Sequence, residues 1–137
     1  MFFGKGTCFT CHSVGGKGGV FGPDLSNIGE IRSKHDILEA IVYPSASFAR
    51  AYETYKVVTG TTTYTGVIAE QLADAVMVTV GPGPGLRVSW ADITSIEPHN
   101  VSMMPPGLDQ QLSKEELSDL MAFLEALPDP MKRLKVQ

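Results

Sequence analysis

Two cysteines and a histidine near the start of the chain carry the most specific chemistry in the sequence. Cys8 and Cys11 are separated by two residues, and His12 follows the second cysteine directly. In a Cys-x-x-Cys-His pattern the two thiols can add to the vinyl groups of a haem, and the adjacent imidazole can bind the iron. The spacing therefore predicts one covalently attached haem c, held by Cys8 and Cys11, with His12 as an iron ligand.

Other chemistries of a cysteine pair fit the rest of the sequence less well. A thioredoxin-like dithiol needs a βαβ context, and a zinc site needs two further ligands at short spacing. The chain has only two cysteines, and its other histidines, His35 and His99, lie far from the pair and from each other. A redox dithiol and a structural disulfide stay open as alternatives.

The ligand on the opposite side of the iron decides what a haem can do. An open position allows ligand or peroxide chemistry, whereas a second strong ligand leaves electron transfer; a methionine thioether is a soft donor that raises the reduction potential. Met104 lies in an extended loop, and the two prolines that follow it stiffen the loop on one side. We predict Met104 as the sixth ligand, with Met103, His99 or no ligand as the alternatives.

The segment after His12 must orient its imidazole. Residues 13–19 are rich in glycine and predict a flexible turn, because no strand precedes them and no Gly-Lys-Ser/Thr follows, as a phosphate-binding loop would require. In residues 20–25 a backbone carbonyl can accept the proton of the far ring nitrogen of His12 and raise its basicity toward iron. A simple proline-containing turn is the alternative for this segment.

Helical patterns flank the central part of the chain. Residues 1–7 read as the stub of an amphipathic helix, residues 33–36 as an N-cap, and residues 113–116 as a capping box. Pro44 and Pro128 end the two longer helices. Apolar residues at helical spacing follow each cap: Ile37, Leu38, Ile41 and Val42 in the first, and Leu117, Leu120, Met121, Leu124 and Leu127 in the second. A basic, loose tail is expected over 131–137.

The middle of the chain, residues 53–97, changes to a β pattern. It is rich in threonine, valine, isoleucine and tyrosine, and glycine-containing turns interrupt it at 59–60 and 81–85. Four or five short antiparallel strands would form a small twisted sheet or barrel inserted between the helices. The predicted strands are 54–59, 62–70, 75–80, 86–90 and 94–97.

Length and charge restrict the class of protein. A chain of 137 residues predicts one domain, over 1–137, with 53–97 as an insertion within it. The net charge of −4 argues against a nucleic-acid partner, which needs a clustered basic face. No apolar run approaches the roughly twenty residues of a membrane span, and no signal peptide precedes Cys8. We expect an excised domain or a mature fragment of a longer exported protein.

Side chains that could hold the haem propionates are less specific. Burying a carboxylate without donors is costly, so arginine, tyrosine or tryptophan donors are expected near the propionates. The sequence does not choose among the candidates, and surface roles are the alternative for both arginines. The candidates are Arg32, Arg50, Tyr52 and Trp90.

Taken together, these residues make the chain resemble class I c-type cytochromes. The matching segments are Cys8-Phe9-Thr10-Cys11-His12, Gly22-Pro23-Asp24-Leu25 and Met103-Met104-Pro105 before a terminal helix. The resemblance implies a mainly α cytochrome c fold with an inserted small antiparallel β-sheet or barrel, α+β as a whole. It also implies that the Pro23 carbonyl accepts a hydrogen bond from His12 and that Met104 binds the iron.

A closer resemblance is to the haem-binding Cys-x-x-Cys-His domain typical of Planctomycetes and Verrucomicrobia. That domain lies at the C-terminus of large exported proteins that often carry dehydrogenase-like propellers. The matching pieces include Pro44-Ser45-Ala46, Tyr52-Glu53-Thr54-Tyr55, Thr65-Gly66, Asp92-Ile93 and Met104-Pro105-Pro106-Gly107-Leu108. The resemblance implies a periplasmic or otherwise exported bacterial domain that exchanges electrons with a dehydrogenase domain or with redox proteins.

The expected function is therefore electron transfer rather than enzyme catalysis, through one haem ligated by His12 and Met104. The N-terminal helix that class I cytochromes pack against the last helix is nearly absent, so a homo-oligomer through that region is a further expectation. Two alternatives remain. One is a haem enzyme or a gas or redox sensor with a labile sixth ligand, and the other is a docking module whose β insertion binds a partner.

Overall fold

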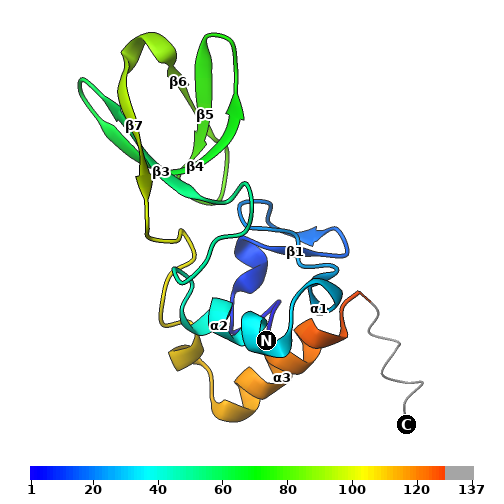
Figure 1. Cartoon of the computed structure of the whole chain (residues 1–137). Helices are drawn as coiled ribbons and strands as arrows, with labels where there is room; N and C mark the ends of the chain where they lie inside the picture. Colours follow the sequence, from blue (N-terminus) through cyan, green and yellow to red (C-terminus); the bar gives the residue numbers. More distant parts are fainter. Residues whose placement is uncertain (129–137) are drawn as a thin grey trace. The chain divides into compact units, whose positions relative to one another are not determined.

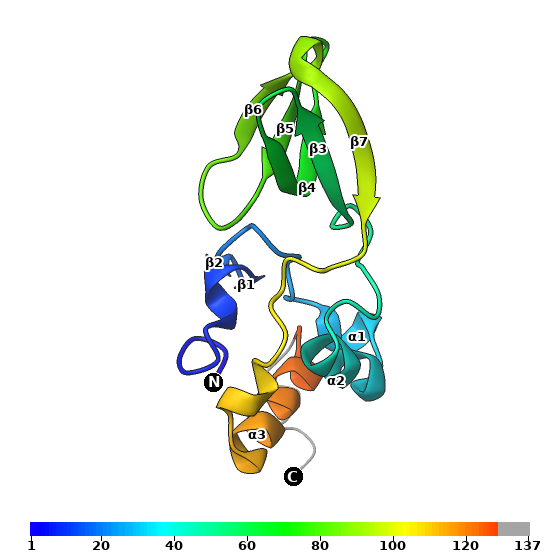
Figure 2. The same ribbon diagram turned by 90° about the vertical axis from the view of Figure 1, so that its left-hand side faces the viewer.

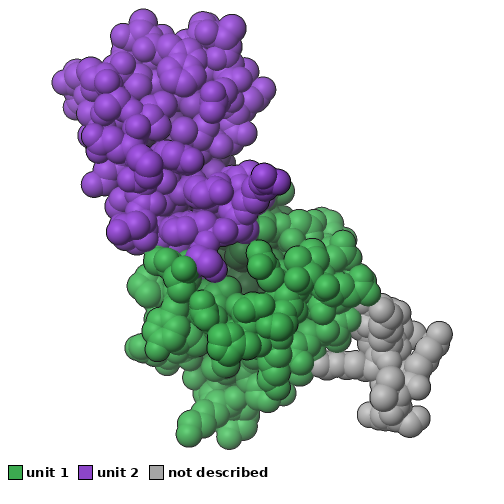
Figure 3. All heavy atoms as spheres, viewed as in Figure 1, with its two compact units in different colours: residues 1–46, 105–137 green, residues 47–104 purple. Residues whose placement is uncertain are grey.

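The computed structural model describes residues 1–128, which pack as two compact units (Figure 3). Unit 1 combines residues 1–46 with the chain from residue 105 onward, and unit 2 spans residues 47–104. The predicted basic tail, 131–137, lies outside the described residues. No helix within residues 1–128 has both the length and the apolarity that a membrane crossing requires.

Unit 1 consists of short helices and one small hairpin. Figure 1 shows α1 and α2 lying beside α3. The helices are α1 (Ile28–Ile31), α2 (Lys34–Val42) and α3 (Lys114–Ala126); the 3-10 turns are η1 (Cys8–Thr10) and η3 (Asp109–Gln111); the hairpin strands are β1 (Ser13–Val14) and β2 (Lys17–Gly18). The buried apolar side chains of this unit are Phe2, Ile37, Ile41, Leu120, Met121, Leu124 and Leu127.

Both longer helices begin where the sequence predicts. The Ser33 hydroxyl accepts a hydrogen bond from the backbone N–H of Asp36, 3.1 Å away. Before α3, Ser113 and Glu116 form the complete capping box, with each side chain accepting from the other residue's backbone N–H. These contacts satisfy N–H groups that a helix start otherwise leaves without partners.

The first residues of the chain do not form the predicted helix stub. They fold as turns, in which the N–H groups of Gly4 and Gly6 donate to the Met1 carbonyl and Thr7 N–H donates to the Gly4 carbonyl. A segment this short cannot repay the cost of nucleating a helix, and two glycines weaken it further. The helix expectation for residues 1–7 is wrong.

Unit 2 is a five-stranded antiparallel sheet with the strand order β6-β5-β4-β3-β7. Each predicted strand is present, with ends that differ by at most two residues. Figures 1 and 2 show the sheet strongly curled, and the 3-10 turn η2 (Trp90–Asp92) joins its two edge strands. The strands are β3 (Thr54–Thr59), β4 (Thr63–Gln71), β5 (Ala75–Thr79), β6 (Leu86–Ser89) and β7 (Ile93–His99).

The curled sheet has a hydrophobic core of its own. Val57, Val76 and Val78 have no exposed surface, and Val88 is 6% exposed. Tyr64, Ile68, Ile93 and Ile96 pack against this cluster, so that all five strands contribute to it. Burial of these β-branched side chains against one another stabilises unit 2.

The expected mainly α fold is wrong. Only about 27% of the structure is helical, and its largest regular element is the five-stranded sheet. The error has a physical cause: glycine and proline keep the helices of unit 1 short, and α1 is a single turn of four residues. The inserted strands meanwhile build a second core. The organisation as one domain over 1–137, with 53–97 as an insertion, stays a prediction.

Candidate functional site

The Cys-x-x-Cys-His motif forms one tight turn. Cys8 begins η1 and Cys11 follows its last residue, and the backbone N–H groups of Cys11 and His12 both donate to the Cys8 carbonyl, at 3.2 and 2.9 Å. Both cysteines are free and half-buried. The turn therefore brings two thiols and one imidazole together on one short piece of chain.

The turn leads into a hairpin where the sequence predicts a flexible loop. Ser13 and Val14 pair with Gly18 and Lys17, and the two residues between them, Gly15 and Gly16, have φ angles of +59° and +77°. Such angles are costly for residues with a Cβ, which explains the paired glycines. The hairpin supports the backbone on which His12 stands, since β1 begins at the next residue.

The imidazole of His12 has a defined hydrogen-bond partner. Its Nδ1 lies 2.7 Å from the carbonyl oxygen of Pro23. Because a carbonyl can only accept, Nδ1 carries the proton and Nε2 keeps its lone pair. Burial lowers the pKa of His12, and the hydrogen bond to Pro23 opposes that shift only in part. The ring is therefore neutral at neutral pH, which is the form that binds metal ions.

Gly22, next to Pro23, closes the other side of the imidazole. A Cβ at this position would lie 2.7 Å from Cε1 of His12, and the Gly22 N–H donates to the Cys11 carbonyl at 2.7 Å. Only a residue without a side chain allows so close an approach between this backbone and the ring. The sequence did not predict this role for Gly22, because local sequence patterns do not report a packing contact between residues ten positions apart.

The two thiols are partly buried, and this burial acts on their pKa. Burial raises the pKa of both the Cys8 and the Cys11 thiol. A redox dithiol depends on a lowered thiol pKa, so the raised pKa of both thiols disfavours the redox-dithiol alternative. Within residues 1–128, no three histidine, cysteine, aspartate or glutamate side chains gather in a way that could hold a metal ion.

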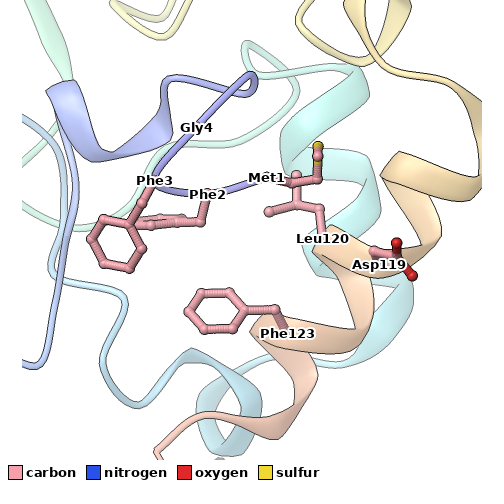
Figure 4. Close-up of a pocket in the computed structure, with 7 residues that line it drawn as sticks. All are labelled: Met1, Phe2, Phe3, Gly4, Asp119, Leu120 and Phe123. Carbon is pink, nitrogen blue, oxygen red and sulfur yellow. The ribbon is translucent and has the colours of Figure 1, made fainter.

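The segment that enters the motif is held against the last helix by aromatic side chains. The ring centroids of Phe2 and Phe123 lie 5.7 Å apart, and Phe2 meets Phe3 edge-on at 4.8 Å. Figure 4 shows these rings beside a hollow of about 280 Å³ between the first four residues and α3. Phe2 is buried while Phe3 stays half exposed. Phe2 thus anchors the start of the chain six residues before Cys8.

The predicted sixth ligand belongs to the other unit. Met104 is the last residue of unit 2, and both it and Met103 are half-buried. Its backbone N–H donates to the Ser102 hydroxyl at 3.1 Å, which folds the loop back on itself just before the two prolines. Cys8, Cys11, His12 and Pro23 all lie in unit 1.

The propionate candidates differ in what they already contact. The Trp90 indole N–H donates to the Leu72 carbonyl at 2.9 Å, so its only donor is in use. Arg32 and Arg50 are exposed, and Tyr52 is half-buried. Tyr52 and the two arginines remain candidates.

The donor set of unit 1 fits a covalently bound haem. Two neighbouring thiols are available for thioether bonds, a neutral imidazole offers Nε2, and the carbonyl of Pro23 fixes that tautomer. These are the groups that attachment and proximal ligation require.

Comparison with known proteins bears on the same residues. No curated protein matches the chain. A family model described as cytochrome c matches residues 1–77, which is more than half of the 137 residues and includes the Cys-x-x-Cys-His turn, Pro23 and the first two long strands. With its haem-attachment turn and its oriented histidine, the chain belongs to the cytochrome c family of haem-binding electron-transfer proteins.

Proposed function

We propose that this chain is a monohaem electron-transfer domain in which His12 and Met104 are the two axial ligands of the iron. Cys8 and Cys11 would hold the haem through thioether bonds. The observation that carries the proposal is the contact between His12 Nδ1 and the Pro23 carbonyl at 2.7 Å. This contact leaves Nε2 as the ring nitrogen whose lone pair can bind the iron. When bound, the haem supplies a one-electron couple between ferric and ferrous iron.

The residues of unit 1 have separate roles in this proposal. The Pro23 carbonyl holds the His12 ring in one orientation and raises its basicity toward iron. Gly22 has no side chain, so its backbone packs directly against the His12 ring and restricts the room in which the ring can move. The two cysteines would attach the haem to the turn that carries the histidine.

Three properties support Met104 as the second ligand. A thioether is a soft donor suited to haem iron. Pro105 and Pro106 follow it, and Ser102 accepts its backbone N–H, so the loop is restricted on both sides of the residue. A restricted loop loses little entropy when a weak iron–sulfur bond forms.

With both axial positions occupied, the iron would exchange electrons and bind no substrate. We therefore propose a carrier that serves a dehydrogenase domain of the same parent chain or a separate redox protein, in the periplasm or another exported location. The resemblance to the exported domain typical of Planctomycetes and Verrucomicrobia supports this assignment. Phe3 and Met1, both partly exposed beside α3, support a contact with a second copy at the start of the chain.

Optical spectra of two alanine variants test the ligand assignment. Met104→Ala is expected to remove the charge-transfer band at the red end of the ferric spectrum, turn the iron high-spin and lower the reduction potential. Met103→Ala is the matched control, since it removes the same side chain one residue earlier, and it should keep the band. An unchanged spectrum in Met104→Ala would refute the assignment.

The same spectra separate the proposal from an enzyme or a sensor. A labile sixth ligand predicts that the unmodified ferric protein lacks the sulfur band and that the ferrous protein binds carbon monoxide rapidly. The proposed carrier has the band and binds carbon monoxide slowly, because the thioether must leave first.

A further inference from the structure

Thr54 is the most deeply buried polar side chain of unit 2. It is the first residue of β3, which pairs with β4 and with the edge strand β7, and it is only 2% exposed. A hydroxyl removed from water at this level requires a hydrogen-bond partner. The hydrogen-bond partners of Thr54 therefore show which part of the chain the residue fixes in place.

The Thr54 hydroxyl lies between two carbonyl groups, which share its single proton. Its Oγ1 lies 2.9 Å from the carbonyl oxygen of His99 and 2.9 Å from that of Val101. His99 is the last residue of β7, whereas Val101 lies two residues beyond the end of the strand. The hydroxyl thus connects the sheet to a residue that lies beyond the last backbone pair of β7.

The segment held in this way is the one that carries Met104. After β7 the chain has no further regular structure until η3 (Figure 1). Val101 precedes Met104 by three residues, so a fixed Val101 carbonyl confines the Met104 backbone to within about 10 Å. The bond from Met104 N–H to Ser102 Oγ shortens that reach further.

Thr54 lies on the opposite face of the sheet from the valine cluster. Side chains alternate along a strand, so Thr54 and Val57, three residues apart, face opposite sides of the sheet. Val57 belongs to the valine core and Thr54 does not. On its own face Thr54 pairs with Val67, which is also buried, while its hydroxyl is directed to the segment after β7.

We infer that Thr54 is a positioning residue for the Met104 ligand: its hydroxyl fixes the loop after β7 to the sheet, so that the thioether is presented with little loss of entropy. The inference rests on the proposed function, in which Met104 binds the iron. It gives the inserted sheet a role in the redox site, as the rigid support of one axial ligand.

The test is the ferric spectrum and the reduction potential of the complete holoprotein. Thr54→Val keeps the shape of the side chain and removes the hydroxyl, so we expect the ratio of bound to unbound thioether to fall by about tenfold, the effect of losing one buried hydrogen bond. The charge-transfer band should weaken and the potential should fall. Thr54→Ser keeps the hydroxyl and should restore both values.

Two further variants separate positioning from general destabilisation. Thr94→Val removes a hydroxyl-to-carbonyl bond at an exposed position of the same strand pair, from Thr94 to Val58 at 3.1 Å, and so tests the loss of a threonine hydroxyl away from the loop. Val76→Ala weakens the core of the sheet without touching the loop. Both should keep the band and the potential of the unmodified protein.

The inference is overturned if Thr54→Val keeps the unmodified spectrum and potential, or if Val76→Ala changes them as much as Thr54→Val does. A Met104→Ala variant that retains the band would overturn the proposed ligand itself, and the positioning role with it. If Met104→Ala loses the band while Thr54→Val keeps the unmodified band and potential, the ligand assignment is supported and only the positioning role of Thr54 is refuted.

Discussion

The backbone of Gly22 forms the wall against which the His12 imidazole lies. A Cβ on Gly22 would come within 2.8 Å of Nδ1 and 3.1 Å of Nε2, the two nitrogens on which ligation depends. The neighbouring Pro23 carbonyl binds the first of these nitrogens. A two-residue segment thus sets both the orientation and the tautomer of the histidine.

Replacing Gly22 by alanine should disturb the histidine directly. The added methyl group must displace the ring or the backbone, and overpacking of this kind costs about 1–3 kcal/mol. We expect a lower free energy of unfolding for the holoprotein, measured with guanidinium chloride, together with a shifted reduction potential. Gly4→Ala is the control, because no atom lies within 4 Å of a Cβ there. Equal stability of the two variants would contradict the packing argument.

Covalent attachment should depend on the two cysteines of the turn. The double variant Cys8→Ala/Cys11→Ala is expected to lose all haem on a denaturing gel stained for haem, whereas each single variant keeps one thioether. Both thiols are half-buried and free, and the haem-free chain offers no other cysteine. A double variant that still carried haem after denaturation would disprove the attachment site.

The ion pair between the start of the chain and α3 should make stability depend on pH. Lys5 Nζ lies 2.8 Å from Glu116, and this hydrogen bond, followed by that from the Ser113 N–H, lowers the pKa of the Glu116 carboxyl. A carboxylate whose pKa is lowered by folding stabilises the protein above its unfolded pKa, and the contribution disappears as the pH falls through the folded value.

On acidification below about pH 4.5, the ordinary pKa of glutamate, the unmodified protein should therefore lose more stability than Glu116→Gln. The comparison uses the midpoint of chemical unfolding measured across this pH range. Glu115→Gln, one residue earlier on the same helix turn, is the matched control and should follow the unmodified protein. Parallel curves for all three proteins would rule out the ion pair as the cause.

The core of the sheet should be sensitive to the loss of two methyl groups. Val76 has no exposed surface, so Val76→Ala leaves a cavity, and we expect the free energy of unfolding of unit 2 to fall by roughly 2 kcal/mol. The far-ultraviolet circular dichroism of the β signal reports this transition. Val80→Ala, at a position 42% exposed, should change little. A Val76→Ala protein as stable as the control would show that the cluster does not hold the sheet.

Local features of the fold could be predicted from the sequence. The Cys8–His12 motif, the caps at Ser33 and Ser113 and the five strands all depend on residues within a few positions of one another. Periodicity and capping report such short-range interactions directly. The helix expected over residues 1–7 failed because a pattern of apolar residues says nothing about the cost of nucleation.

The sequence by itself determined the chemistry of the site: two thiols and an imidazole at the spacing that haem attachment needs. Only the tertiary structure decided how the imidazole is packed, through the contact of His12 with Gly22. The tertiary structure likewise decided how the loop after β7 is tied to the sheet, through the bond from Thr54 to Val101, 47 residues away. It also decided the balance of the fold, since the strands close on a core of their own and the protein is not mainly α. Contacts between distant residues depend on how whole elements pack, and no local pattern records them.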